Sequence, residues 1–122
     1  MTSARCIAVL VVEDDEDIRD LVVHVLEAEG FDVYQAENGE QALGVLEIMP
    51  QPALILADLM MPVMDGPSLI AALRGSAQFA TLPVVIMSAV SGETAGARHR
   101  IKKPLDMSAL ILIVGEVCRR RR

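Results

Sequence analysis

Three short aliphatic runs constrain the fold of this chain more than any other feature of the sequence. They are CIAVLVV at residues 6–12, ALILA at 53–57 and VVIMS at 84–88. Runs of this length without polar alternation are typical of strands that are covered on both faces. Two further strands are predicted at residues 31–36 and 99–102.

Helical segments separate most of these strands. The first, residues 16–29, has apolar side chains at helical spacing: Ile18, Leu21, Val22, Val25 and Leu26. Asn38 is predicted to cap a second helix, and Pro67 lies in the first turn of a third. Asp106 is predicted to cap a last helix that runs to about Cys118.

Alternating strands and helices predict an α/β fold with a doubly wound, five-stranded parallel sheet. Right-handed crossovers allow the flavodoxin-like strand order 2-1-3-4-5. In that order the first and third strands flank the point where the chain reverses direction across the sheet. Ligands bind at this point, beyond the carboxyl ends of the strands.

Length and composition limit the classes of protein. With 122 residues and 52% hydrophobic residues, the chain is predicted to form one domain over residues 1–122. The net charge of -6 argues against nucleic-acid binding, and four of the 11 bases form a basic tail or linker start at residues 119–122. Neither a membrane-spanning run nor a signal peptide is visible, so we expect a cytoplasmic protein.

Charged residues follow the predicted strands at one edge of the sheet. Glu13, Asp14 and Asp15 come after the first strand, Asp58 after the third and Lys103 after the fifth. Each acid alone could be a helix cap or a surface residue. Taken together, these carboxylates and one ammonium at the switch point indicate a magnesium site beside a reactive aspartate.

Four motifs occur in an order that resembles the receiver domains of two-component response regulators. They are LVVEDDEDIR, ADLMMPVMDG, PVVIMSA and KKPLD. The resemblance covers essentially the full length. It implies a phosphorylation-controlled signalling module, not an enzyme that turns over a separate substrate.

The resemblance also implies roles for single residues. Asp58 would accept a phosphoryl group from a sensor histidine kinase or a phosphotransfer protein. Glu13, Asp14, Asp58 and the backbone carbonyl of Met60 would bind Mg²⁺. Ser88 would meet the phosphoryl group through its hydroxyl, and Lys103 would pair with it. Asp15 has no direct role in this pattern.

The region between Ser88 and Lys103 departs from the family pattern. Family members have a full fourth helix there, whereas AVSGETAGARH is short, contains two glycines and has few apolar residues. We expect this helix to be shortened to about a turn or replaced by a disordered loop. The family's aromatic switch position is Arg100, so the usual coupling of hydroxyl and aromatic motion is in doubt.

Two alternatives to a working phosphoryl switch follow. A receiver-like interaction domain with impaired switching would explain the short segment before Lys103. A haloacid-dehalogenase-type phosphatase also uses an aspartate after a strand, but it needs a second acid where this chain has Met60.

The last helix, LDMSALILIVGEVC, is apolar on more than one side. Leu110, Val114 and Val117 are predicted to face the core. Ile111, Leu112 and Ile113 then remain for burial elsewhere or for a homodimer contact.

Overall fold

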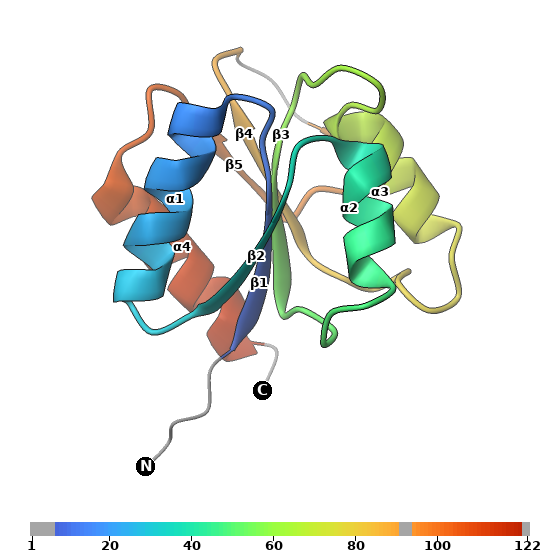
Figure 1. Ribbon diagram of the computed structural model, residues 1–122, viewed down its shortest axis with the longest axis horizontal. Helices are drawn as coiled ribbons and strands as arrows, with labels where there is room; N and C mark the ends of the chain where they lie inside the picture. Colours follow the sequence, from blue (N-terminus) through green and yellow to red (C-terminus); the bar gives the residue numbers. More distant parts are fainter. Residues whose placement is uncertain (1–6, 91–93, 121–122) are drawn as a thin grey trace.

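The structure, a computed structural model, describes residues 7–90 and 94–120. Its centre is a parallel sheet made of β1 (Ala8–Val12), β2 (Asp32–Ala36), β3 (Leu54–Asp58), β4 (Val84–Ser88) and β5 (His99–Lys102). The strand order is β2-β1-β3-β4-β5, which confirms the predicted order. The strands of Figure 1 therefore end at a common edge, with β1 and β3 at the middle of the sheet.

Four helices complete the described fold: α1 (Glu16–Ala28), α2 (Gly39–Leu46), α3 (Gly66–Arg74) and α4 (Met107–Arg120). Figure 1 shows α1 and α4 on one face of the sheet and α2 and α3 on the other. This two-sided cover is the doubly wound arrangement that the sequence predicted. The last helix includes Arg119 and Arg120, so it reaches into the run expected to be a tail.

Side-chain caps fix where the helices begin. Asn38 accepts a hydrogen bond from the Gln41 amide at 2.8 Å, as predicted for the start of α2. Asp106 accepts bonds from two amides in the first turn of α4. These caps satisfy backbone donors that the helix cannot pair internally.

The sheet separates two hydrophobic clusters. One lies between the sheet and α2 and α3, and the other lies between the sheet and α1 and α4. Leu110, Val114 and Val117 are fully buried in the second cluster, which confirms the predicted inward face of the last helix. None of the helices in the described part of the chain has the length and apolar content needed to span a membrane.

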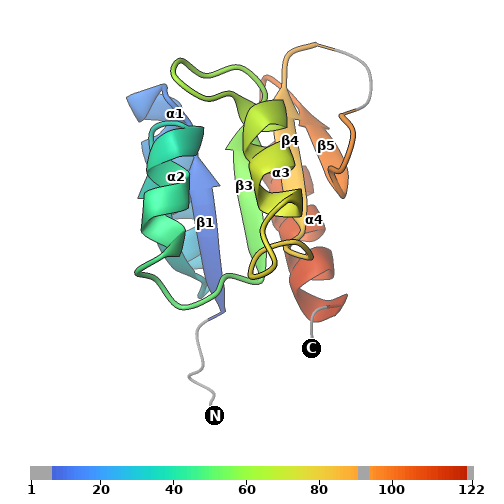
Figure 2. The ribbon, with the colours of Figure 1, turned by 90° about the vertical axis from the view of Figure 1, so that its right-hand side faces the viewer.

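The link between β4 and β5 contains no helix in its described residues, 89–90 and 94–98. Instead, the Ala97 amide closes a turn onto the Thr94 carbonyl at 3.1 Å. Arg74, the last residue of α3, donates a 2.8 Å hydrogen bond to the Gly96 carbonyl. Figure 2 shows the described part of the link beside β5. The expected fourth helix is thus shortened to a turn that packs on α3, while residues 91–93 lie outside the described residues.

Candidate functional site

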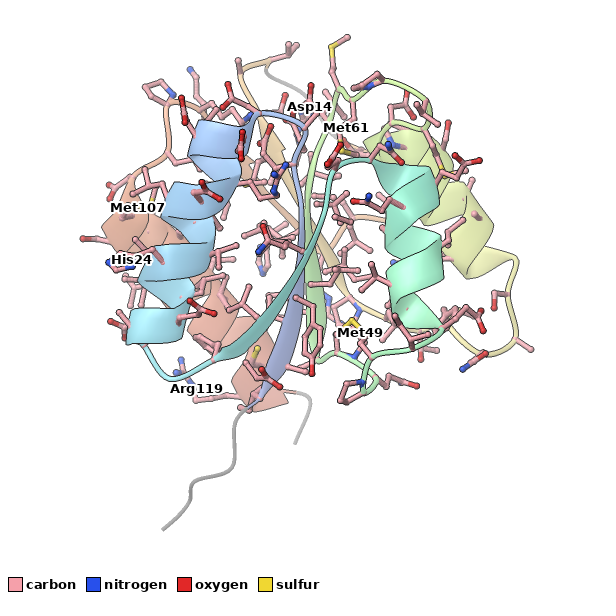
Figure 3. All side chains as sticks on the ribbon, viewed as in Figure 1. Asp14, His24, Met49, Met61, Met107 and Arg119 are labelled. Carbon is pink, nitrogen blue, oxygen red and sulfur yellow. The ribbon has the colours of Figure 1, made fainter. Side chains whose placement is uncertain are left out.

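The ends of four strands bring the predicted site residues together. Glu13 directly follows β1, Asp58 ends β3, Ser88 ends β4 and Lys103 directly follows β5. In Figure 3, Asp14 lies at this same edge of the sheet, beyond the ends of the strands. Because parallel strands share one direction, their carboxyl ends place residues distant in sequence side by side.

Lys103 links two of the carboxylates. Its ammonium nitrogen lies 3.0 Å from Glu13 Oε1 and 3.1 Å from Asp58 Oδ1. Glu13 is only 1% exposed and Asp58 8%, so water screens these contacts poorly. One cation therefore holds two buried acids from opposite sides of the switch point.

The acids form a cluster suited to a divalent metal ion. Ligand oxygens of Glu13, Asp14 and Asp58 all lie within 4.8 Å of one another. Mg²⁺ prefers hard oxygen ligands and keeps several waters, so a few carboxylates at one open edge suit it. Asp14 is exposed, which leaves the cluster open to solvent on one side. The donor set thus fits the expected ion.

Burial changes the acid–base behaviour of this cluster. Burial raises the pKa of Glu13 above its ordinary value, an effect that its hydrogen bond with Lys103 only partly offsets. Burial alone would lower the pKa of Lys103, but the contacts with Glu13 and Asp58 outweigh burial and raise it. Lys103 therefore stays charged at neutral pH, and Glu13 resists losing its proton more than an exposed glutamate does.

The backbone around the acids is held by contacts that the sequence analysis did not identify. Arg19 donates a 2.9 Å hydrogen bond to the Glu13 carbonyl, and the Asp15 amide donates to Glu13 Oε2 at 3.1 Å. Asp15 itself caps α1 by accepting from the Ile18 amide. Arg19 lies six residues after Glu13, which precedes α1, so no helical side-chain spacing signalled this contact with a backbone carbonyl.

Close backbone packing positions Asp58. A Cβ atom added to Gly66 would lie 2.7 Å from the Asp58 carbonyl oxygen, closer than side chains pack. The Gly66 amide donates to the Leu59 carbonyl at 2.9 Å, and Asp65 caps α3 through the Ser68 amide. The glycine in the Asp65-Gly66 pair therefore allows α3 to begin directly against the end of β3.

Ser88 is 2% exposed and its hydroxyl is engaged with the backbone of Val90. The hydroxyl donates to the Val90 carbonyl at 3.1 Å and accepts from the Val90 amide at 2.9 Å. The Arg100 guanidinium also donates to this carbonyl, at 2.7 Å. Arg100, which the resemblance marked only as a missing aromatic, thus holds the segment that follows Ser88.

A pocket of about 200 Å³ opens above these groups. Asp58, Ser88 and Lys103 line it, together with Met60 and Val90. The Met60 and Val90 side chains are largely exposed and apolar. The pocket is small, polar at its base and apolar at its mouth, and it is close enough to the carboxylate cluster to share Asp58.

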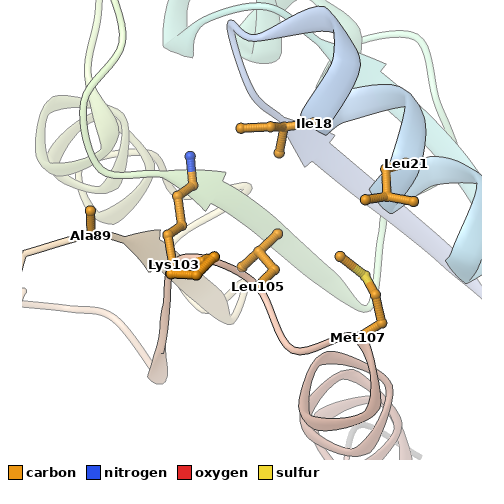
Figure 4. Close-up of a pocket in the computed structure, with 7 residues that line it drawn as sticks. Ile18, Leu21, Ala89, Lys103, Leu105 and Met107 are labelled. Carbon is orange, nitrogen blue, oxygen red and sulfur yellow. The ribbon is translucent and has the colours of Figure 1, made fainter.

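An apolar groove of about 470 Å³ begins beside this pocket. Figure 4 shows Ile18 and Leu21 of α1 facing Leu105 and Met107, while the Lys103 nitrogen points away from Leu105 and Met107. Leu21 shares the apolar helical spacing of α1, but its side chain is 49% exposed. The stripe is narrower than its spacing indicated, because the groove leaves the N-terminal half of α1 partly uncovered.

Comparison with known proteins agrees with this geometry. The family model for the response regulator receiver domain matches residues 9–115. An uncharacterized 14.6 kDa protein from Leptolyngbya boryana is 38% identical, with 90% of this chain and 88% of that protein covered. The phosphate regulon transcriptional regulatory protein PhoB from Klebsiella pneumoniae is 37% identical over 92% of this chain, which spans about half (52%) of PhoB.

A similar solved structure is the receiver domain of a signal transduction histidine kinase from Syntrophus aciditrophicus. Its TM-score is 0.83 with 30% identity, and the match covers 91% of this chain and 89% of that one. The family match extends over the strand ends that carry the acids, the hydroxyl and the ammonium. The chain therefore belongs to the receiver domains of response regulators, the signalling modules of two-component systems.

Proposed function

We propose that Asp58 is the phosphoacceptor of this receiver domain. The observation that carries the proposal is the contact of Lys103 with both Glu13 and Asp58, beside exposed Asp14. A carboxylate that attacks phosphorus must approach an anion, and its own neighbours here are anionic. Groups that neutralise this charge must therefore be part of the site.

Glu13, Asp14, Asp58 and the Met60 carbonyl would hold Mg²⁺. The ion would supply charge neutralisation and a ligand position for a phosphoryl oxygen. Both oxygens of Glu13 already accept a hydrogen bond, one from Lys103 and one from the Asp15 amide. We therefore assign the more direct ligand roles to Asp14 and Asp58, with Glu13 holding the ammonium in place.

The chain's own residues position the transfer. One Asp58 oxygen forms a bond to phosphorus as the donor's phosphorus–nitrogen bond breaks. Lys103 stays charged and neutralises the new anion from the base of the pocket. The Ser88 hydroxyl, now donating to the Val90 carbonyl, can turn its proton to a phosphoryl oxygen. Val90 and its segment would then shift, which is the proposed switch.

The donor would be a phosphohistidine on a sensor histidine kinase or a phosphotransfer protein. Its imidazole must reach Asp58 beside Lys103, and the apolar groove starts at the same lysine. An amphipathic helix that carries the histidine could bury apolar side chains against Ile18, Leu21 and Met107. The domain would catalyse only its own phosphorylation and dephosphorylation, with no separate substrate.

Labelling with a small acyl phosphate in Mg²⁺ tests the assignment. Wild type should form an acid-stable, base-labile phosphoaspartate, and Asp58→Asn should not. Asp20→Asn changes an exposed carboxylate of α1 and is the matched control, which should label normally. Undiminished labelling of Asp58→Asn would refute the proposal.

A second candidate is a receiver-like interaction domain with impaired switching. The observation that favours it is the turn in place of a helix between β4 and β5. Normal labelling without any change in amide exchange at Val90 would support this candidate. The phosphatase alternative is not favoured, because the receiver family matches residues 9–115 and Met60 occupies the position of the required second acid.

A further inference from the structure

Charge is divided between two halves of the chain. Most of the 17 acids lie in residues 13–47, where Arg19 is the one base. In residues 66–105, Glu93 is the one acid and lies outside the described residues. The bases of that second segment are Arg74, Arg98, Arg100, Lys102 and Lys103.

The fold converts this division into two oppositely charged sides. The strand order puts β2 at one edge of the sheet and β5 at the other. Figure 2 shows α1 and α2 at the side of β1, far from β5. The acidic segment thus surrounds one edge, while Arg98, His99, Arg100 and Lys102 follow one another along the opposite edge.

Nothing in the described part of the chain neutralises the basic edge. Arg98, His99 and Lys102 are exposed, and the ion pairs of Lys103 with Glu13 and Asp58 do not involve them. Arg100 donates to a backbone carbonyl, which leaves its positive charge uncompensated. The short β4–β5 link places no helix over this edge in its described residues.

The backbone of β5 is also available. Among the described strands, β5 pairs with β4 alone, so its other side presents free N–H and C=O groups. An extended peptide can add to such an edge through main-chain hydrogen bonds, with its side chains giving specificity. Charged edge strands, above all those with lysine, also prevent unwanted pairing. A segment whose carboxylates complement these bases would overcome that protection.

We propose that the β5 edge is a docking surface for an extended acidic segment of a partner protein, which pairs with β5 as an added strand. The complementary charge attracts the segment to this edge, while the acidic half of the domain repels it elsewhere. The proposal does not rest on Asp58 being the phosphoacceptor. Nucleic acid is the less favoured occupant, because the whole chain is acidic at -6.

A synthetic 12-residue peptide of alternating Glu and Thr is a direct probe, and its binding is measured by fluorescence anisotropy. Wild type should bind it at low ionic strength and lose affinity as salt increases. The double variant Arg98→Glu/Lys102→Glu should bind at least about tenfold more weakly, because attraction becomes repulsion at two positions. Arg119→Glu, an exposed reversal on α4, is the matched control and should bind as wild type does.

A second peptide tests the strand pairing separately from charge. Methylation of alternate backbone nitrogens keeps every carboxylate but removes the donors that would face β5. This peptide should lose most of the affinity, and equal binding would refute the added strand. The proposal is also overturned if wild type binds neither peptide, or if the double variant binds as well as wild type.

Binding of either of two other partners at the β5 edge would contradict the proposed acidic segment. Tighter binding of a single-stranded oligonucleotide than of the acidic peptide would assign the edge to nucleic acid. Salt-sensitive self-association that the double variant abolishes would assign it to a second copy of this chain.

Discussion

Replacing Asp58 with asparagine should stabilise the metal-free domain. The change removes one of three carboxylates whose ligand oxygens lie within 4.8 Å of one another. It also removes one of the two carboxylates that contact Lys103, at 3.1 Å, but Glu13 still contacts the ammonium at 3.0 Å. The sign of the effect depends on whether lost repulsion exceeds lost attraction.

The distances show whether the lost repulsion or the lost attraction is larger. Two like charges 4.8 Å apart repel by about 3.5 kcal/mol at an effective dielectric of 20, and Asp58 has two such neighbours. Its attraction to Lys103 at 3.1 Å is about 5 kcal/mol on the same scale. Water screens exposed Asp14, so we expect a net gain of about 1 kcal/mol and a Tm increase of about 4 °C.

Thermal unfolding in EDTA tests the repulsion among the acids, and thermal unfolding in millimolar MgCl₂ tests metal binding at Asp58. In EDTA, Asp58→Asn should melt above wild type, while Asp20→Asn should match wild type within about 0.5 kcal/mol. In MgCl₂, wild type should gain stability because the ion binds only the folded site. Asp58→Asn should gain little, since one of the carboxylate ligands is gone.

Two results would refute the reasoning. A lower melting temperature for Asp58→Asn in EDTA would mean that the ion pair with Lys103 outweighs the repulsion among the acids. An equal response of wild type and Asp58→Asn to MgCl₂ would mean that the ion does not bind at Asp58.

Three further predictions concern the site, the link and the last helix. Because burial raises the pKa of Glu13, protonated Glu13 contributes stability below the ordinary pKa of 4.5, and this contribution is lost as pH rises through the folded-state pKa. In the metal-free domain, Glu13→Gln should remove this fall in stability with pH. A pH–stability curve that Glu13→Gln leaves unchanged would contradict the prediction. Gly96→Ala should destabilise the domain by about 1–3 kcal/mol in urea unfolding, because its φ is +84° and the new Cβ would lie 2.7 Å from Ile70. Gly44→Ala, with open space around it, should not destabilise it. If the domain forms a homodimer through α4, Leu112→Glu should convert a sedimenting dimer to a monomer without loss of stability, because Leu112 is 70% exposed; a monomeric wild type at high concentration would exclude this dimer.

The sheet and the position of the site could be predicted because both follow from short-range signals. An aliphatic run of about five residues is too short for a typical helix and favours a buried strand, so a charged residue directly after it is predicted to lie at a strand end. The positions of Asp58 and Ser88 could therefore be predicted from the strands that they end. The caps Asn38 and Asp106 were equally local, since each acts on amides within three residues.

The contacts that hold the site could not be predicted, because they join residues without a shared pattern. Arg100 and Val90 lie on different sides of an irregular link, and the hydrogen bond between them depends on how that link folds back. Leu21 matched the apolar spacing of α1, yet the β5–α4 connection does not cover it. Periodicity indicates which face is apolar, but the width of the buried stripe depends on neighbours from elsewhere in the chain.

The short β4–β5 link affects one part of the domain without disturbing the other. The acids, Ser88 and Lys103 are fixed by the buried sheet, and the Lys103 amide still bonds to the Ser88 carbonyl at 2.8 Å. The described part of the link instead packs near α3, where Arg74 bonds to the Gly96 carbonyl and Ala97 lies against the core cluster. The short link therefore leaves the acids, Ser88 and Lys103 together at the strand ends. The short link instead changes the surface beside β5, where Arg98, His99 and Lys102 are exposed.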